Sequence, residues 1–292
     1  SPGEIPAMPS LHSRWHGIVD ARMRARTEAT ASADLTRVLL RHASRLGLDA
    51  RDVCRAVDID PAALETPGAR LSLARFAALW EAVASRAGDP DFGLHLGAAI
   101  VSSASGHLLL AVLRNCPTVA DAIDRFFRYH DLLADIVRPE IRRGVDAVHV
   151  AWMPGSARVH RHHVEAVFST FVTALRQVSE DRLQLETVRF RHPGSASAEH
   201  RRIFGAPVLF GEPVNEVVFA RRFLALPISL ASSELLRDLE ALAQRQLARV
   251  STPAAWAEKT ASAISAALLG GQASGVAAVA GSLAVGSRTL QT

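Results

Sequence analysis

The segment IVRPEIRRGVDAVHVAW, residues 136–152, decides the fold class, because its apolar residues recur every second position rather than every 3.6. Two such runs, 136–142 and 145–152, flank an Arg-Gly pair that suits a tight turn, and this pattern predicts a β-hairpin. We expect three apolar side chains to share one face of its second strand: Val148, Val150 and Trp152. The centre of the chain is therefore predicted to form a sheet.

Helical patterns surround this hairpin. Residues 158–179 predict a long helix with an inward stripe that comprises Val159, His163, Val167, Thr170, Phe171, Ala174 and Val178. Further segments read as a strand at 185–191, a helix at 198–204, and strands at 208–210 and 216–220. Upstream, helical spacing begins after Asp34, which we expect to be the N-cap residue. The predicted fold class is α+β, predominantly helical.

The length of 292 residues predicts about two domains. Residues 1–33 combine Pro, Gly and Ser without a sustained period and are expected to form a flexible arm. Residues 34–250 then form the first domain, and a break at Ser251-Thr252-Pro253 separates it from a second domain at 253–292. A hydrophobic content of 49% excludes a wholly disordered chain.

The charge and the cysteines give weaker information about location and partners. A net charge of +4 over this length is by itself little evidence for nucleic-acid binding. Cys54 and Cys116 form no CxxC pair, so we expect reduced, buried thiols and a cytoplasmic protein. Residues 260–287 carry no charge, but they are mostly Ala, Gly and Ser and contain a Gly-Gly break, so no membrane span is expected.

The segment 274–291 carries the strongest functional signal. Two short helices around a tight turn fit a helix-turn-helix, and the second helix would present polar side chains at its N-terminal end. The candidate DNA-binding residues are Ser287, Arg288, Thr289 and Gln291, because arginine can pair with guanine and glutamine with adenine. An Ala-rich helical hairpin without a DNA role explains this segment alone equally well.

Other segments of the chain favour the first interpretation. Residues 279–291, VAGSLAVGSRTLQ, resemble part of the DNA-binding domain of AraC/XylS-type transcription regulators, and specifically the group with an arabinose-binding-type N-terminal effector domain. Residues 39–97, 117–135 and 188–228 resemble segments of that effector domain, in the same order. The resemblance implies that 34–250 binds a small-molecule effector and forms a homodimer, and that 253–292 begins a helix-turn-helix domain.

Three departures from the family's pattern concern this last segment. Ala284 stands where the family usually has a turn glycine, and Gly286 replaces its serine N-cap. The chain ends at Thr292, within the first of the two DNA-reading helices that the family implies. We therefore expect a truncated DNA-binding domain, and we expect this 292-residue piece not to bind its operator specifically.

Candidate effector-binding residues lie on a helix and on the hairpin: Arg125, Tyr129, His130 and Trp152. A cation and several rings would suit an effector, although a solvated helix face with one partly buried histidine, and a core tryptophan, explain the same residues. His160 and His163 have the i, i+3 spacing of a metal-ligand pair, but apart from Glu165 no cysteine or carboxylate cluster accompanies them. We expect no metal site and no cofactor.

The predicted function is that of an effector-responsive transcription regulator which binds operator DNA in its full-length form. No P-loop, G-x-S-x-G, H-E-x-x-H or G-x-G-x-x-G motif is present, so we expect no enzyme and name no catalytic residue. The alternative is a small-molecule-binding or enzymatic domain with no DNA role.

Overall fold

The computed structural model describes residues 30–66, 68–102, 108–134, 139–152, 159–229, 231–250 and 276. The chain divides into two compact units between Ala243 and Gln244, inside the last described helix, α11 (Ser233–Val250), and the fold below is that of the first unit. All four candidate DNA-binding residues, 287–289 and 291, lie outside the described residues. None of the helices in the described part of the chain is both long and apolar enough to cross a membrane.

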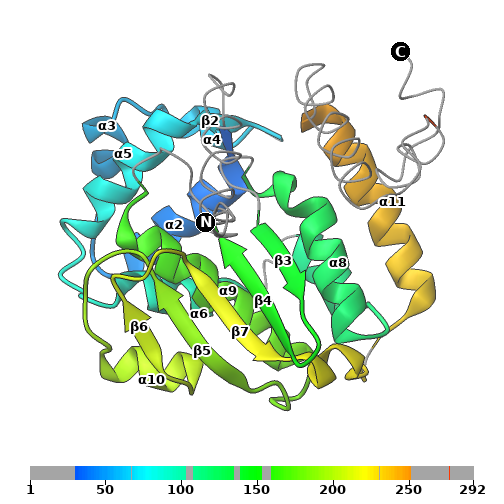
Figure 1. Ribbon diagram of the computed structural model, residues 1–292. Coiled ribbons are helices and arrows are strands. Elements are labelled where there is room, and N and C mark those ends of the chain that lie inside the picture. Colours follow the sequence, from blue (N-terminus) through cyan, green and yellow to red (C-terminus); the bar gives the residue numbers. More distant parts are fainter. Residues whose placement is uncertain are drawn as a thin grey trace, which may run out of the picture. The chain divides into compact units, whose positions relative to one another are not determined.

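The N-terminal part is a group of short helices and a two-stranded ribbon (Figure 1). Its elements are β1 (Thr30–Ser32), α2 (Ala33–Arg45), α3 (Ala50–Ala56), α4 (Pro61–Leu64), β2 (Arg70–Ser72) and α5 (Leu73–Ala84). Strands β1 and β2 pair antiparallel. Side chains of Asp49, Asp60 and Ser72 accept backbone N–H groups at the starts of their helices, which satisfies donors that have no partner within the helix.

Two sequence predictions are wrong at the start of this part. The N-cap of α2 is Ser32 rather than Asp34, because the Ser32 side chain accepts the N–H of Asp34 itself. Residues 30–32, which were predicted to belong to the arm, form β1 instead. The N–H of Ser32 also donates to the carbonyl of Leu133, so contacts distant in sequence order this segment.

The described residues of the central part form α-helices and a short 3-10 turn. These are α6 (Phe92–Ser102), α7 (Leu108–Arg114), α8 (Val119–Tyr129), η1 (His130–Leu132) and α9 (Arg161–Val178). Helices α6 and α9 are in intimate contact, because Gly93 and Gly97 present no side chain at their crossing. A Cβ atom on Gly93 would lie 2.2 Å from the carbonyl oxygen of His162, and one on Gly97 would lie 2.4 Å from that of Ala166.

The predicted hairpin belongs to a five-stranded sheet with the order β3-β4-β7-β5-β6. The strands and the segments that connect them are β3 (Pro139–Arg143), β4 (Ala147–Trp152), β5 (Leu185–Phe190), α10 (Ala198–Phe204), β6 (Val208–Phe210), β7 (Glu216–Ala220) and η2 (Arg221–Ala225). Among the strands of the described residues, only β5 and β6 pair parallel, and α10 connects them. The hairpin turn is longer than predicted, since β4 begins at Ala147.

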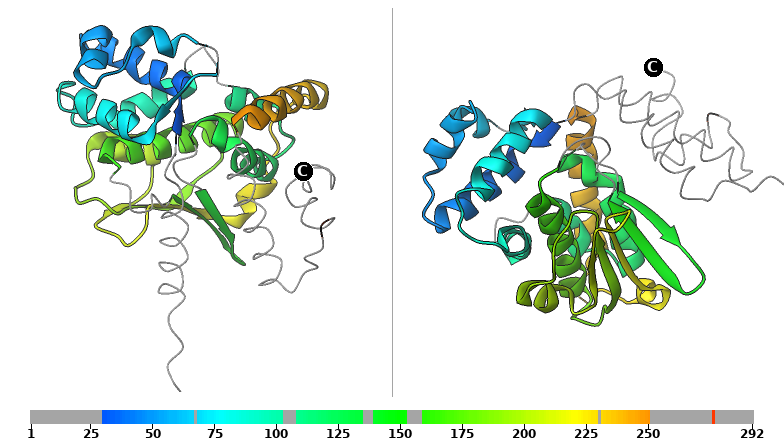
Figure 2. Two further views of the ribbon diagram at one scale, coloured as in Figure 1. Left: turned by 90° about the horizontal axis from the view of Figure 1, so that it is seen from above. Right: turned by 60° about the vertical axis from the view of Figure 1, so that its left-hand side comes forward.

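Helix α9 separates the sheet from the N-terminal helices, as the left view of Figure 2 shows. On one side, Phe168 contacts Phe190 of β5, with ring centroids 5.4 Å apart. On the other side, His163 stacks on Trp80 of α5. The α+β, mainly helical fold class predicted from the sequence is confirmed, and α9 is its central element.

Candidate ligand-binding cavity

An apolar cavity lies beside α9 in the first unit. The volume of this cavity is about 110 Å³. Its walls come from α2, from α5 to α9, from η1 and the residues after it, and from the end of β4. Among the described residues that line it, those with a polar side-chain group are His130, His163 and Thr170, together with Trp80 and Trp152, each of which carries an indole N–H.

The wall contributed by α9 is the stripe that the sequence predicts. His163, Val167, Thr170, Phe171 and Ala174 recur at three- and four-residue intervals, and all five line the cavity. The Thr170 hydroxyl donates to the carbonyl of Gly97, 3.2 Å away, so the polar group of this side chain is already bonded to α6. The stripe therefore presents a largely apolar surface.

Aromatic rings from α8, β4 and α9 form another part of the wall. The ring of Phe126, on α8, lies 5.5 Å from that of Trp152 and 5.5 Å from that of Phe171, measured between centroids. Trp152 shares its strand face with Val148 and Val150, as predicted, and both valines are fully buried. These centroid distances are typical of favourable aromatic pairs, and the rings offer an apolar surface to a ligand in the cavity.

His163 is a cavity residue with strongly perturbed acid–base behaviour. Its ring stacks on Trp80 at 5.0 Å and meets Phe76 edge-on at 5.3 Å. Burial among these rings, assisted by the charge of His160, lowers the pKa of His163 to about 4. The imidazole is therefore neutral at pH 7, with one N–H donor and one acceptor nitrogen.

The structure does not bring the four candidate effector-binding residues together. His130 and Trp152 line the cavity, whereas Arg125 and Tyr129 are not among the lining residues. Instead, these two contact Glu240 of α11: Arg125 Nε lies 3.3 Å from its carboxylate, and the Tyr129 hydroxyl donates to it at 3.3 Å. These two side chains thus connect a cavity-lining helix to α11.

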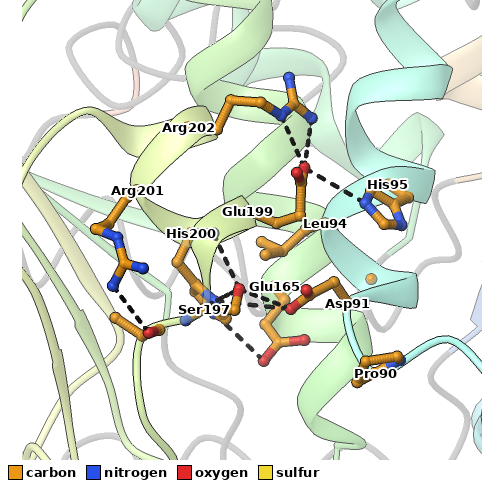
Figure 3. Close-up of polar contacts among 12 residues, drawn as sticks. Pro90, Asp91, Leu94, His95, Glu165, Ser197, Glu199, His200, Arg201 and Arg202 are labelled. Atoms are coloured by element: carbon orange, nitrogen blue, oxygen red, sulfur yellow. Dashed lines mark hydrogen bonds and ion pairs between the residues drawn. The ribbon is translucent and has the colours of Figure 1, made fainter.

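A second buried site lies on the other side of α9, around Glu165 (Figure 3). His162 Nδ1 lies 2.9 Å from one Glu165 oxygen, while Nε2 of His192 and Nε2 of His200 each lie 3.7 Å from the other. His200 Nδ1 accepts the backbone N–H of Ser197, which leaves its proton on Nε2, facing Glu165. We call Glu165, His162, His192 and His200 the Glu165 cluster.

Hydrogen bonding decides the ionisation of Glu165. Burial raises the pKa of this carboxyl, but the N–H groups of His162 and His200, together with the charge of Arg161, outweigh burial and lower it to about 2. No group of three or more His, Cys, Asp or Glu side chains in the described part of the chain is placed to hold a metal ion. The cluster joins α9 to α10 and to the end of β5.

Polar contacts continue from this cluster to the start of α6. The Ser197 hydroxyl donates to Asp91 at 2.9 Å, and His95 lies between Asp89 and Glu199, as Figure 3 shows in part. The i, i+3 pair that resembled a metal site has separate partners, because His160 faces Glu81 and His163 faces Trp80.

Both cysteines are free and buried, as predicted, and burial raises the pKa of Cys116 to about 12.

Several cavity residues were missed because the sequence presents them as ordinary core. Trp80, Ile100 and Leu113 belong to apolar helix patterns that fit a filled interior equally well. The available signal was the stripe on α9, in which a histidine and a threonine alternate with small or aliphatic residues. A stripe of that kind indicates a wall with some polarity, but it cannot reveal that space remains in front of it.

Comparisons with known proteins agree with this architecture. The family described as "Arabinose-binding domain of AraC transcription regulator, N-term" matches residues 47–228. The ornithine utilization regulator of Pseudomonas aeruginosa is 27% identical over 221 residues, which are 72% of this chain and 62% of that protein. The chain thus spans less than two thirds of the length of this relative.

A solved structure shares the fold. The crystal structure of the transcriptional regulator CdpR from Pseudomonas aeruginosa matches with a TM-score of 0.50 and 20% sequence identity, over 82% of this chain and 75% of that one. The family match over residues 47–228 covers more than half of the chain and includes nearly all of the cavity-lining residues. The chain therefore belongs to the family of arabinose-binding N-terminal domains of AraC transcription regulators.

Proposed function

We propose that this protein is an effector-responsive transcription regulator. Its first domain, 34–250, binds a small molecule and forms a homodimer, and its segment 253–292 begins a helix-turn-helix domain that contacts operator DNA in the full-length protein. The observation that carries the proposal is the apolar cavity in a domain that belongs to a regulator family. The protein acts in the cytoplasm by binding, with no catalytic step.

Within this proposal, His130 and Trp152 contact the effector, because both line the cavity. Ser287, Arg288, Thr289 and Gln291 contact DNA, as the resemblance of 279–291 implies. To Arg125 and Tyr129, which are not among the lining residues, we assign a different role from effector binding. Through Glu240 they connect α8, which forms part of the cavity wall, to the helix that leads along the chain toward residue 253.

Such a connection can transmit a binding event only under one condition. The effector must bind one arrangement of α8 more tightly than another, since a ligand with equal affinity for both states shifts nothing. Phe126 and Ile123 face the cavity from the same helix that carries Arg125, so an occupant that moves them also moves the partner of Glu240. This is the mechanism that we propose for the coupling.

Sequencing of genomic DNA fragments retained by the purified full-length gene product tests the proposal. We expect a small set of enriched sites that share one sequence motif. Arg288→Ala should lose them, because a base-contacting arginine contributes roughly 1–3 kcal/mol of discrimination. The matched control is Arg55→Ala on α3, whose exposed side chain pairs with the exposed Asp52 on the same helix, and it should retain every site. The absence of any sequence-specific site would reject a DNA-binding role.

A further inference from the structure

We propose that the cavity beside α9 takes a small, uncharged, hydrocarbon-rich molecule that carries one hydrogen-bonding group, rather than a sugar or an amino acid. This inference rests on the proposed function and names the chemical class of its effector. It departs from what the names of the family and of the ornithine utilization regulator suggest. Three properties of the cavity wall support it.

The first property is the near absence of polar groups on the described wall. A sugar presents several hydroxyl groups, each of which needs a hydrogen-bonding partner once it leaves water. Of the polar side chains on this wall, Thr170 already bonds the Gly97 carbonyl, and His130 Nδ1 lies 3.0 Å from the carbonyl of Phe127. A polyhydroxylated ligand would leave most of its own groups unsatisfied here, which is costly.

The second property is the lack of fixed charge. Among the residues described, no Arg, Lys, Asp or Glu side chain lines the cavity. An amino acid such as ornithine carries a carboxylate and ammonium groups, and transfer of an unpaired ion into an apolar site is strongly unfavourable. His163 does not replace such a partner, since it is neutral at pH 7.

The third property is the His163 imidazole, a hydrogen-bonding group on the wall whose neighbours are aromatic rings. Among the described residues, none makes a hydrogen bond to the His163 ring, whose contacts are Trp80 and Phe76. A neutral imidazole can donate to or accept from a hydroxyl, carbonyl or amide group. The facing rings of Phe126, Trp152 and Phe171 favour an aromatic or aliphatic body for the same ligand.

Binding in the cavity can be observed directly, because two of the four tryptophans of the chain, Trp80 and Trp152, line it. The other two, Trp15 and Trp256, lie outside the described residues. Fluorine NMR of the chain labelled with 5-fluorotryptophan, titrated at pH 7, reports on each separately. The probes are p-cresol, toluene, benzoate, L-arabinose and L-ornithine. We expect p-cresol and toluene to shift the Trp80 and Trp152 resonances saturably, and the other three probes to leave them unchanged.

Two variants distinguish binding in the cavity from non-specific binding elsewhere on the protein. Val167→Phe fills the cavity and should abolish both titrations, while the matched control Val145→Phe, at a site 87% exposed in the β3–β4 turn, should preserve them. His163→Phe keeps a stacked ring but removes the hydrogen bond, so the affinity for p-cresol should fall about 3- to 10-fold while that for toluene stays the same.

Two results would overturn the proposed ligand class. One is a shift of the Trp80 and Trp152 resonances by arabinose, ornithine or benzoate. The other is p-cresol binding that survives Val167→Phe. Equal losses for p-cresol and toluene in His163→Phe would remove the hydrogen-bonding role. Failure of the proposed function looks different. In that case p-cresol still binds in the cavity, but the full-length protein retains no specific genomic site.

Discussion

His162 and His163 are adjacent in the sequence, yet they lie in opposite kinds of interior. His162 bonds the ionised Glu165 in a cluster of polar groups, whereas His163 stacks on Trp80 in an apolar cavity. Consecutive residues of a helix point about 100° apart, so a single residue step along α9 is enough to place them in different surroundings. The comparison shows that residue type alone predicts neither the partner nor the surroundings of these two side chains.

Removal of the Glu165 charge should have the largest effect. Glu165→Gln keeps the size of the side chain but takes the ionised partner away from His162, His192 and His200. We expect the free energy of unfolding, measured by urea denaturation at pH 7, to fall by about 3 kcal/mol. Glu186→Gln, at an exposed position on β5, is the matched control and should change it by less than about 0.5 kcal/mol. A similar small effect for both variants would mean that the Glu165 cluster contributes little to folding.

The two sites should also lose stability in different ranges of pH. The folded chain resists protonation of His163 until about pH 4, while the unfolded chain protonates this residue near 6.5, so stability falls between these values as the pH decreases. The expected loss is about 3 kcal/mol. Glu165, with its pKa lowered to about 2 from an ordinary 4.5, contributes stability that is lost as the pH falls from about 4.5 toward 2.

Variants assign each pH range to its residue. In urea denaturation at a series of pH values, His163→Phe should show a smaller loss between pH 6.5 and 4 and keep the loss below 4.5. Glu165→Gln should show the reverse. The same pH profile in wild type and His163→Phe would contradict a His163 that stays neutral in the folded chain down to about pH 4.

The smallest effect is expected at the half-buried contact between α8 and α11. The side chains of Arg125 and Glu240 are 22% and 18% exposed, more than those of His162 and Glu165, which are 5% and 1% exposed. A double-mutant cycle with Arg125→Met and Glu240→Gln should give a coupling energy of about 0.5–1 kcal/mol in the free energy of unfolding. Arg128→Met, at an exposed position of α8, should show none with Glu240→Gln, and equal coupling for both arginines would indicate a non-specific charge effect.

Local patterns predicted the elements well but not their partners. The bounds of α10 and of strands β6 and β7 agree with the predicted 198–204, 208–210 and 216–220, because turn residues and short apolar runs define them within a few positions. Capping was less reliable, since Ser32 and Asp34 compete for the same helix start and the pairing of β1 with β2 favours Ser32.

The candidate site depended on contacts between distant parts of the chain. Arg125 and Tyr129 have the composition of a binding surface, and nothing near them in the sequence indicates Glu240, more than 100 positions away. Glu165 stood beside histidines in the sequence, but the approach of His192 and His200 requires the β5–α10 segment to fold back against α9. His163 was correctly predicted to face inward, whereas the open space in front of it is a property of the packing of several helices.

The burial of both cysteines has a practical consequence. Thiolate is the reactive form of cysteine, and burial raises the pKa of Cys54 and raises that of Cys116 to about 12, so both thiols should react slowly with maleimides and methanethiosulfonates. A single cysteine introduced at an exposed position, such as 237 on α11, can then be labelled selectively in the otherwise natural sequence. The chain is in this sense ready for spin labels or fluorophores that measure how α11 moves when the cavity is occupied.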